Sequence, residues 1–253
     1  MFTRAIVRKP GKSIIHGLTS VSLGNPDYAL ALIQHAAYVK ALEACGLQVS
    51  TFAADEMFPD STFVEDIALV TSKSAILTRP GAVSRRGEVV AMAKVLSIYF
   101  DQLEVVQSPG TVEAGDILMV GDDFYIGLSA RTNENGANQV ISILEKYGYR
   151  GHVAPVGEML HYKSGIAFLE NQTLVAVEEG IDLTPFHGYR VISVPKTEAY
   201  AANCVWVNGT VLVAKGYPKT LALIKSAGYK TIVLDMSEFR KLDGGLSCLS
   251  LRF

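Results

Sequence analysis

The segment that decides the fold spans residues 117–156 and reads ILMVGDDFYIGLSARTNENGANQVISILEKYGYRGHVAPV. Its first part, Ile117–Ser129, combines β-branched and aromatic residues with a central Gly-Asp-Asp, which is typical of a hairpin. Glu134–Tyr147 has apolar residues three and four positions apart, as in a helix that packs on a core. Gly151–Val156 follows as a further strand. The segment therefore predicts a unit of two strands, a helix and a third strand (ββαβ).

The same order of elements recurs on both sides of this segment. Three further units are predicted: hairpin Ile67–Thr78, helix Arg86–Phe100 and strand Leu103–Gln107; hairpin Gly165–Val177, a weak helix near Asp182–His187 and strand Arg190–Val194; and hairpin Cys204–Ala214, helix Lys219–Ala227 and strand Lys230–Leu234. The hairpins begin about 40 to 50 residues apart, a spacing found in propellers and solenoids.

The two ends of the chain complete a fifth unit. A C-terminal strand, Leu246–Leu251, is expected to pair with Arg4–Arg8, which is followed by a helix, Tyr28–Ala44, and a strand, Gln48–Ala53. Pairing one end with the other removes the exposed sheet edges that invite aggregation. We therefore expect one domain, residues 1–253, built as a closed α/β ring of five ββαβ units. A doubly wound α/β protein of two domains is the alternative.

The composition excludes several classes of function. Of the 253 residues, 49% are hydrophobic and 19% are charged, the balance of a globular protein with ample core. The formal net charge of −2 provides no basic field, which argues against a nucleic-acid partner. No apolar run is long enough to span a bilayer, and the N-terminus does not read as a signal peptide. Three scattered cysteines fit neither a disulfide framework nor a zinc site. We expect a cytoplasmic protein without metal, cofactor or membrane association.

Residues that carry chemistry lie at or just before the first strand of each hairpin. These segments are Glu65-Asp66, Glu113–Asp116, His161–Gly165, Ala202–Cys204 and Gly244–Cys248. In a ring, such segments converge on the central axis, so carboxylates, an imidazole and a thiol would share one cavity. Clustered buried carboxylates are costly unless paired, which favours a cationic ligand. Taken singly, each acid could instead cap a turn.

Four of these motifs resemble the bacterial type of the dimethylarginine dimethylaminohydrolase family. They are Phe63-Val64-Glu65-Asp66, Gly110–Asp116, Leu160–Ser164 and Asp243–Cys248. The resemblance runs over essentially the whole chain. It implies the five-bladed ββαβ propeller, or pentein fold, of the guanidine-modifying (arginine deiminase) superfamily. It also implies hydrolysis of Nω-methylated L-arginine (asymmetric dimethylarginine or monomethylarginine) to L-citrulline and dimethylamine or methylamine.

The resemblance implies three catalytic residues. Cys248 matches the nucleophile, which would form a covalent S-alkylthiouronium intermediate, since a thiolate suits a resonance-stabilised guanidinium carbon. His161 matches the general acid and base that protonates the leaving amine and then activates water. Glu113 matches the carboxylate that orients this imidazole. Cys204 also lies where a hairpin begins and is the rival nucleophile on position alone.

The resemblance also implies a set of substrate contacts. Asp66 would bind the guanidinium through charge-assisted hydrogen bonds, with Glu65 beside it. Asp60 would bind the α-ammonium group. The remaining residues are Arg85 and Arg131, for the α-carboxylate, and Leu18 and Leu242, whose main chain would lie around the ligand, Leu18 in a loop placed as a lid.

Other functions remain open at this point. An arginine or agmatine deiminase would use the same thiol and imidazole but release ammonia, although Arg85 and Arg131 argue for a substrate with a free carboxylate. An amidinotransferase would need an amine acceptor. A non-catalytic propeller that serves as a binding protein would have no reactive thiol. In each enzymatic case the partner is a small molecule, and the protein is expected to be a monomer or a homodimer.

Overall fold

The computed structural model describes all 253 residues, Met1–Phe253. Its strands are β1 (Arg4–Arg8), β2 (Gln48–Phe52), β3 (Ala68–Val70), β4 (Ala75–Leu77), β5 (Leu103–Val105), β6 (Ile117–Val120), β7 (Asp123–Leu128), β8 (Arg150–Pro155), β9 (Ile166–Phe168), β10 (Thr173–Val177), β11 (Arg190–Val194), β12 (Val205–Val207), β13 (Thr210–Ala214), β14 (Lys230–Leu234) and β15 (Leu251–Arg252). The α-helices are α1 (Tyr28–Ala44), α2 (Glu88–Leu96), α3 (Glu134–Lys146), α4 (Pro218–Ser226) and α5 (Ser237–Arg240).

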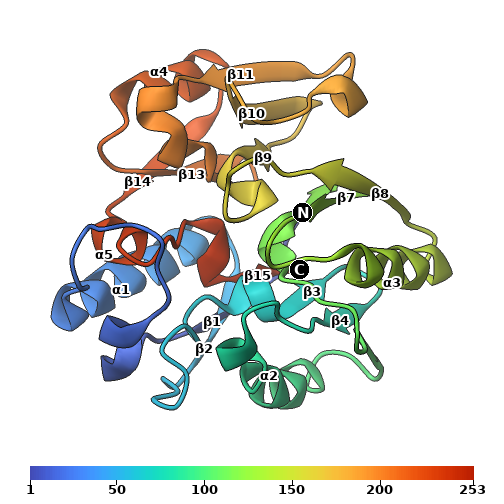
Figure 1. Ribbon diagram of the computed structural model, residues 1–253. Helices are drawn as coiled ribbons and strands as arrows, with labels where there is room; N and C mark the ends of the chain where they lie inside the picture. Colours follow the sequence, from blue (N-terminus) through green and yellow to red (C-terminus); the bar gives the residue numbers. More distant parts are fainter.

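The strands form five separate sheets of three strands each (Figure 1). In every sheet the middle strand is antiparallel to one neighbour and parallel to the other. In the sheet that contains β7, for example, Leu118 pairs with Tyr125 across the hairpin and Ile126 pairs with Val153 of the parallel strand. A parallel neighbour requires a crossover, which a helix usually provides, and α3 fills that place here. The predicted ββαβ order is therefore confirmed in the four modules that contain α1 to α4, whereas only a 3-10 turn lies between β10 and β11.

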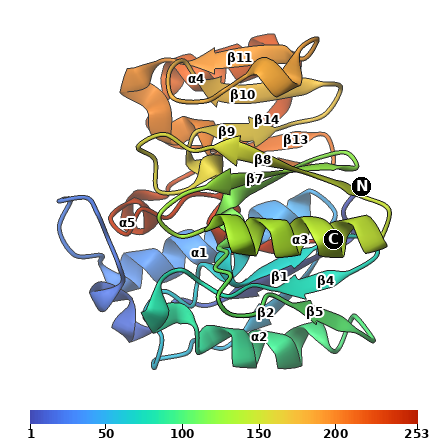
Figure 2. The same cartoon turned by 45° about the vertical axis from the view of Figure 1, so that its right-hand side comes forward.

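The two ends of the chain belong to the same sheet. β15 pairs antiparallel with β1, Ile6 facing Leu251, and β1 pairs in parallel with β2. The main-chain N–H groups of Thr3 and Arg4 both donate to the carbonyl oxygen of Phe253, each at 2.8 Å. Both views show the termini next to each other (Figures 1 and 2). The five sheets thus fit a ring of five modules in which the first and last strands share one sheet.

The helices α1 to α4 lie outside the sheets (Figure 1). The apolar face of each helix packs against its own sheet; on α3, Val140 and Leu144 are fully buried in a cluster with Phe124. Asp27 caps the start of α1 by accepting a hydrogen bond from the Leu30 N–H, and Asn133 caps α3 by accepting from the Gly136 N–H. The helices therefore form the outer layer of the ring.

The inner layer is formed by short 3-10 turns that lead into the hairpins. Five of them are η2 (Val64–Ile67), η4 (Ala114–Asp116), η5 (Tyr162–Ser164), η7 (Lys196–Ala202) and η8 (Ser247–Leu249). Contacts join them in the order η8, η2, η4, η5 and η7, so turns from all five modules lie side by side. The remaining 3-10 turns are η1 (Lys12–His16), η3 (Val83–Arg85) and η6 (Thr184–Phe186).

Three predicted elements differ from the structure. The strand expected over Leu246–Leu251 is instead the turn η8 followed by the two-residue strand β15, because the main chain and side chain of Ser247 bond to Asn203 rather than to a ladder. The weak helix expected near Asp182–His187 is only one turn, η6, ended by Gly188 at φ +88°. The helix expected from Arg86 to Phe100 is shorter, Glu88–Leu96. None of the helices has the length and apolarity needed to cross a bilayer.

Candidate active site

A cavity of about 150 Å³ lies where the 3-10 turns meet. Its lining includes nine of the ten residues that the sequence singled out: Leu18, Asp60, Asp66, Arg85, Glu113, Arg131, His161, Leu242 and Cys248. These residues come from positions 18 to 248 of the chain and meet because four of the five modules contribute residues at or beside their inner turns. The convergence expected from the ring is therefore observed for these four modules, whereas the module of η7 contributes no lining residue. Cys204 does not line this cavity.

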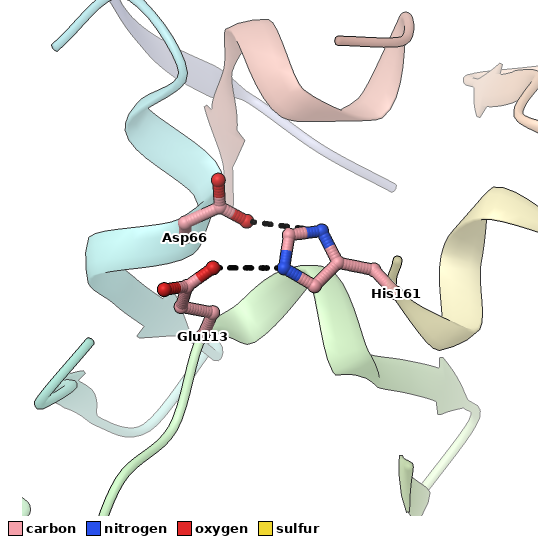
Figure 3. A group of neighbouring side chains, drawn as sticks. All are labelled: Asp66, Glu113 and His161. Carbon is pink, nitrogen blue, oxygen red and sulfur yellow. Dashed lines mark hydrogen bonds and ion pairs between the residues drawn. The ribbon is translucent and has the colours of Figure 1, made fainter. Parts of the chain in front are cut away.

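His161 and Glu113 form a buried pair (Figure 3). His161 Nε2 donates to Glu113 Oε2 at 2.9 Å. The second carboxylate oxygen accepts from the Ala82 N–H at 2.9 Å, which holds the glutamate in place. Burial alone would raise the pKa of Glu113, but the hydrogen bond from His161 and its positive charge outweigh burial and lower this pKa to about 2. Glu113 is thus an anion that fixes one face of the imidazole.

The other ring nitrogen of His161 faces Asp66. His161 Nδ1 lies 3.9 Å from Asp66 Oδ1. Burial on its own would lower the pKa of His161, but the negative charges of Asp66 and Glu113 prevail and raise this pKa to about 9. At neutral pH the side chain is therefore an imidazolium that can donate a proton.

Asp66 presents an unused acceptor to the cavity. Its Oδ2 atom accepts a hydrogen bond from the Arg85 guanidinium, whereas Oδ1 is buried and has no hydrogen-bond partner. A buried carboxylate oxygen without a donor is unfavourable, and a ligand that supplies an N–H would relieve the cost. The geometry fits one edge of a planar cationic group.

Cys248 lies in η8, and 8% of its surface is exposed. Its Sγ accepts a hydrogen bond from the Gly245 N–H at 3.3 Å. Burial, followed by the charges of Asp66 and Glu65, raises the pKa of the thiol to about 12. The resting side chain is therefore a protonated thiol. A cation bound beside it would offset both carboxylates and favour the thiolate.

Asp60 and the loop after η1 form another side of the cavity. Asp60 Oδ1 accepts from the Leu18 N–H at 3.0 Å, and burial raises the pKa of this carboxyl group. Asp243 Oδ2 accepts from the Ser20 N–H at 2.6 Å. Two acids thus hold the loop that carries Leu18 over the cavity, while Leu18 itself is 40% exposed.

The two arginines differ in how many N–H donors remain free to bind a ligand. Arg85 is buried: Nε and Nη2 bond to Glu88, Nη1 bonds to Asp66, and Nη2 also bonds to main-chain oxygens of Asp60 and Phe63. Of the five N–H donors of a guanidinium, only one on Nη1 is unused. The side chain of Arg131 is 23% exposed, and its one side-chain bond is to Glu113 at 3.5 Å. Arg131 therefore has the freer set of donors.

Glu65 is the predicted residue that does not line this cavity. Its carboxylate accepts from Ser247 Oγ at 2.6 Å and pairs with Lys163 Nζ at 2.6 Å. It lines an adjoining cavity of about 270 Å³, which also reaches His161 and Cys248. Another cavity, of about 450 Å³, includes Glu65 but neither of those two residues.

Asp66, Glu113 and His161 also have the composition of a cation site, since one ligand atom from each lies within 4.8 Å of the others. However, the His161–Glu113 hydrogen bond and the Arg85–Asp66 ion pair already use the imidazole Nε2 and one oxygen of each acid. An imidazolium would have to lose its proton before it could bind a metal. The arrangement is that of an acid–base group.

Several residues of the site have no signal in the sequence beyond their type. Glu88 neutralises Arg85 from one turn further along the chain. Asp116 accepts hydrogen bonds from Ser129 Oγ, Thr132 Oγ1 and the Tyr162 N–H, and so ties η4 to η5. Such partners become visible only when the modules are assembled, because their separations in sequence follow no fixed spacing.

Comparison with known proteins gives one consistent family. The family described as "N,N dimethylarginine dimethylhydrolase, eukaryotic" matches residues 26–179. The N(G),N(G)-dimethylarginine dimethylaminohydrolase of Pseudomonas aeruginosa is 51% identical, over 100% of both chains. The protein of the same name from Streptomyces coelicolor is 36% identical, over 98% of this chain and 96% of its own. A crystal structure of the Pseudomonas aeruginosa protein, a Cys-to-Ser mutant complexed with citrulline, superposes with a TM-score of 0.97 at 51% identity and covers 100% of both chains.

Proposed function

Because the chain belongs to the N(G),N(G)-dimethylarginine dimethylaminohydrolase family, we propose that it hydrolyses asymmetric dimethylarginine and monomethylarginine to L-citrulline and dimethylamine or methylamine. The observation that carries the proposal is that Asp66 Oδ1 has no hydrogen-bond donor, in a cavity that also holds a thiol and a carboxylate-bound imidazolium. An acceptor, a nucleophile and a proton donor around one small space are what the cleavage of a guanidinium C–N bond requires. The citrulline complex of the 51% identical relative supports the assignment.

Binding of the substrate begins with its charges. The guanidinium donates to Asp66 Oδ1, and the α-carboxylate binds Arg131 with the free Arg85 donor nearby. The α-ammonium group binds Asp60, while the loop with Leu18 and the Leu242 segment close over the ligand. The positive charge beside Cys248 lowers the pKa of the thiol, so its proton leaves to solvent and the thiolate forms.

The first half of the reaction releases the amine. Cys248 Sγ attacks the central guanidine carbon, and His161 gives its proton to the methylated nitrogen as the C–N bond breaks. This leaves neutral dimethylamine or methylamine, a neutral imidazole and a covalent S-alkylthiouronium. Glu113 holds the imidazole in one orientation throughout.

The second half regenerates the enzyme. Water attacks the thiouronium carbon while His161 takes one of its protons. The C–S bond then breaks, the Cys248 thiolate leaves, and citrulline forms with loss of a second proton, which the released amine accepts in solution. The overall balance is substrate cation plus water to citrulline plus the protonated amine. No cofactor takes part in any step.

We also propose that residues 1–253 form one domain with the closed, five-bladed pentein architecture. The support is the same strand order in all five sheets, the crossover helix in four of them and the β1–β15 pairing. On this arrangement Glu65 acts near the guanidinium through the Cys248 segment rather than as a direct wall of the substrate cavity.

The test is an amine-release assay with asymmetric dimethylarginine, monomethylarginine and arginine at equal concentrations. We expect citrulline and stoichiometric dimethylamine or methylamine from the two methylated substrates. Ammonia from arginine as the faster reaction would replace the proposal with an arginine deiminase. No turnover of any of the three would favour the non-catalytic binding protein.

A further inference from the structure

Four of the five modules place a residue of the proposed reaction in or next to their inner turn. Asp66 lies in η2, Glu113 precedes η4, His161 precedes η5 and Cys248 lies in η8. The fifth position is Asn203, the residue that ends η7. It is buried, 7% exposed, and does not line the substrate cavity.

The side chain of Asn203 joins the segments of the two reacting residues. Its Nδ2 donates to the main-chain oxygen of Lys163 at 2.9 Å and to Ser247 Oγ at 3.0 Å. Its Oδ1 accepts from the Ser247 N–H at 2.9 Å. Lys163 lies two residues after His161, and Ser247 directly precedes Cys248. One amide therefore spans two segments that are more than 80 residues apart.

Further side-chain contacts close this link into a cyclic network of hydrogen bonds and one ion pair. Ser247 Oγ donates to Glu65 Oε2 at 2.6 Å, and Glu65 Oε1 pairs with Lys163 Nζ at 2.6 Å. The path from Lys163 through Glu65, Ser247 and Asn203 thus returns to Lys163. Glu65, Asn203 and Ser247 are buried and the Lys163 side chain is 15% exposed, so the four side chains hold one another in a fixed geometry.

No hydrogen bond joins the thiol of Cys248 directly to the imidazole of His161. The hydrogen bond of Cys248 Sγ comes from Gly245, and the hydrogen bond of the His161 ring goes to Glu113. Neither bond connects the two residues. A Cβ atom on Gly245 would lie 2.4 Å from Asn203 Oδ1, so the main chain before the nucleophile packs directly against the amide. The separation of sulfur and imidazole therefore depends on the segments that Asn203 joins.

We propose that Asn203 is a positioning residue for the reaction: it holds the Cys248 turn in register with the His161 segment. The inference rests on the proposed function, since it assigns Asn203 a part in that same site. A displacement of about 1 Å between reacting groups can cost about a hundredfold in rate. Asn203 touches neither substrate nor reacting atoms and acts through Ser247 and Lys163.

The chain offers a matched control in Asn208. Its side chain also makes three long-range hydrogen bonds, with the N–H and oxygen of Phe2 and the oxygen of Cys45, but at the far end of the β12–β13 hairpin. Because Asn208 has φ +48°, Asn208→Gly removes these bonds without backbone strain. Asn203→Ala removes the same number beside the site.

The experiment compares both variants with the wild type in kcat, KM, melting temperature and the rate of Cys248 alkylation by iodoacetamide. We expect similar losses of melting temperature. Only Asn203→Ala should lower kcat, by about a hundredfold with a smaller change in KM. Iodoacetamide should also alkylate Cys248 faster in this variant, because the loosened turn exposes the thiol. The alkylation rates of Cys45 and Cys204 should not change.

Equal kcat losses in Asn203→Ala and Asn208→Gly, or unchanged kcat and alkylation in Asn203→Ala, would overturn the proposal. If Asn203→Ala does not fold, Ser247→Ala serves instead, because it removes the two hydroxyl bonds and keeps the Ser247 N–H bond to Asn203. It should shift kcat and alkylation in the same directions by less, and unchanged values would again overturn the role. Failure of the wild type on all methylarginines refutes the proposed function, whereas the alkylation comparison still decides the role of Asn203.

Discussion

At the scale of single residues, the site is organised by charge. His161 lies between two carboxylates that keep it protonated, whereas burial, reinforced by the charges of Asp66 and Glu65, keeps Cys248 a thiol. The free site therefore holds an acid ready to donate and a nucleophile that is not yet formed. A cationic substrate favours ionisation of the Cys248 thiol and leaves the His161 imidazolium in place. Selectivity for guanidinium compounds follows, because a neutral ligand would not generate the thiolate.

The pH dependence follows from these two pKa values. The reactive form of the free enzyme needs the thiolate together with the imidazolium. The population of this reactive form rises about tenfold per pH unit up to the pKa of His161, about 9. Between pH 9 and the pKa of Cys248, about 12, the population stays level. We expect kcat/KM for monomethylarginine to increase from pH 7 to pH 9. A flat or falling profile over that range would show that the thiol is already ionised.

The two arginines should respond differently to mutation. Arg131→Lys keeps a charge but loses the planar fork, so we expect KM to rise about tenfold with little change in melting temperature. Arg85→Met leaves Asp66 and Glu88 buried without their cation, which should destabilise the fold by about 3–5 kcal/mol. Kinetics and thermal unfolding of both variants provide the check. An Arg131→Lys enzyme with unchanged KM would remove Arg131 from the carboxylate site.

At the scale of elements, the site belongs to 3-10 turns rather than to strands or helices. The strands and helices were largely predictable, because period-two and three-to-four patterns report which face is buried. The turns were not: η8 arises from long-range bonds between Ser247 and Asn203, which no local pattern encodes. The sequence identified Cys248 but placed it in a strand. It could not show that Glu65 pairs with Lys163 or that Arg85 is nearly saturated.

Gly115 in η4 tests how tightly these turns pack. A Cβ atom there would lie 2.7 Å from both Asp66 Oδ1 and His161 Nδ1. We expect Gly115→Ala to lower kcat/KM about a hundredfold, since it displaces the acid and the guanidinium acceptor together. Gly157→Ala is the matched control, because its Cβ would meet nothing closer than 3.5 Å. Equal activity of the two variants would mean that η4 shifts without consequence for the site.

At the scale of the whole molecule, the ring allows distant parts of the chain to meet at one axis. The five-unit repeat and the pairing of the chain ends were predictable, since the pattern recurs and the leftover termini complete it. The positions of the inner turns were not, because they depend on how neighbouring modules pack. Phe253 illustrates the closure: its ring packs against Tyr99 and Phe100 of the next module, at centroid distances of 5.4 and 5.5 Å.

Removal of residues 251–253 should therefore affect the entire fold. The deletion eliminates β15, the bonds to Thr3 and Arg4 and the aromatic contacts of Phe253. We expect a loss of more than about 3 kcal/mol in unfolding free energy, measured by urea denaturation. Phe253→Ala keeps the main-chain pairing of β15 with β1 and should lose less unfolding free energy than the deletion. A deletion variant as stable as the wild type would show that the ring does not depend on this closure.

The most direct test of the account is the covalent intermediate itself. The wild-type protein is mixed with excess asymmetric dimethylarginine, quenched in acid during turnover and digested, and the cysteine-containing peptides are weighed by mass spectrometry. We predict that the peptide with Cys248, and neither of the other cysteine peptides, gains the mass of the substrate less dimethylamine. Cys248→Ser should gain nothing and release no citrulline. Citrulline formation by Cys248→Ser at the wild-type rate, or an adduct on Cys204 instead, would contradict the account.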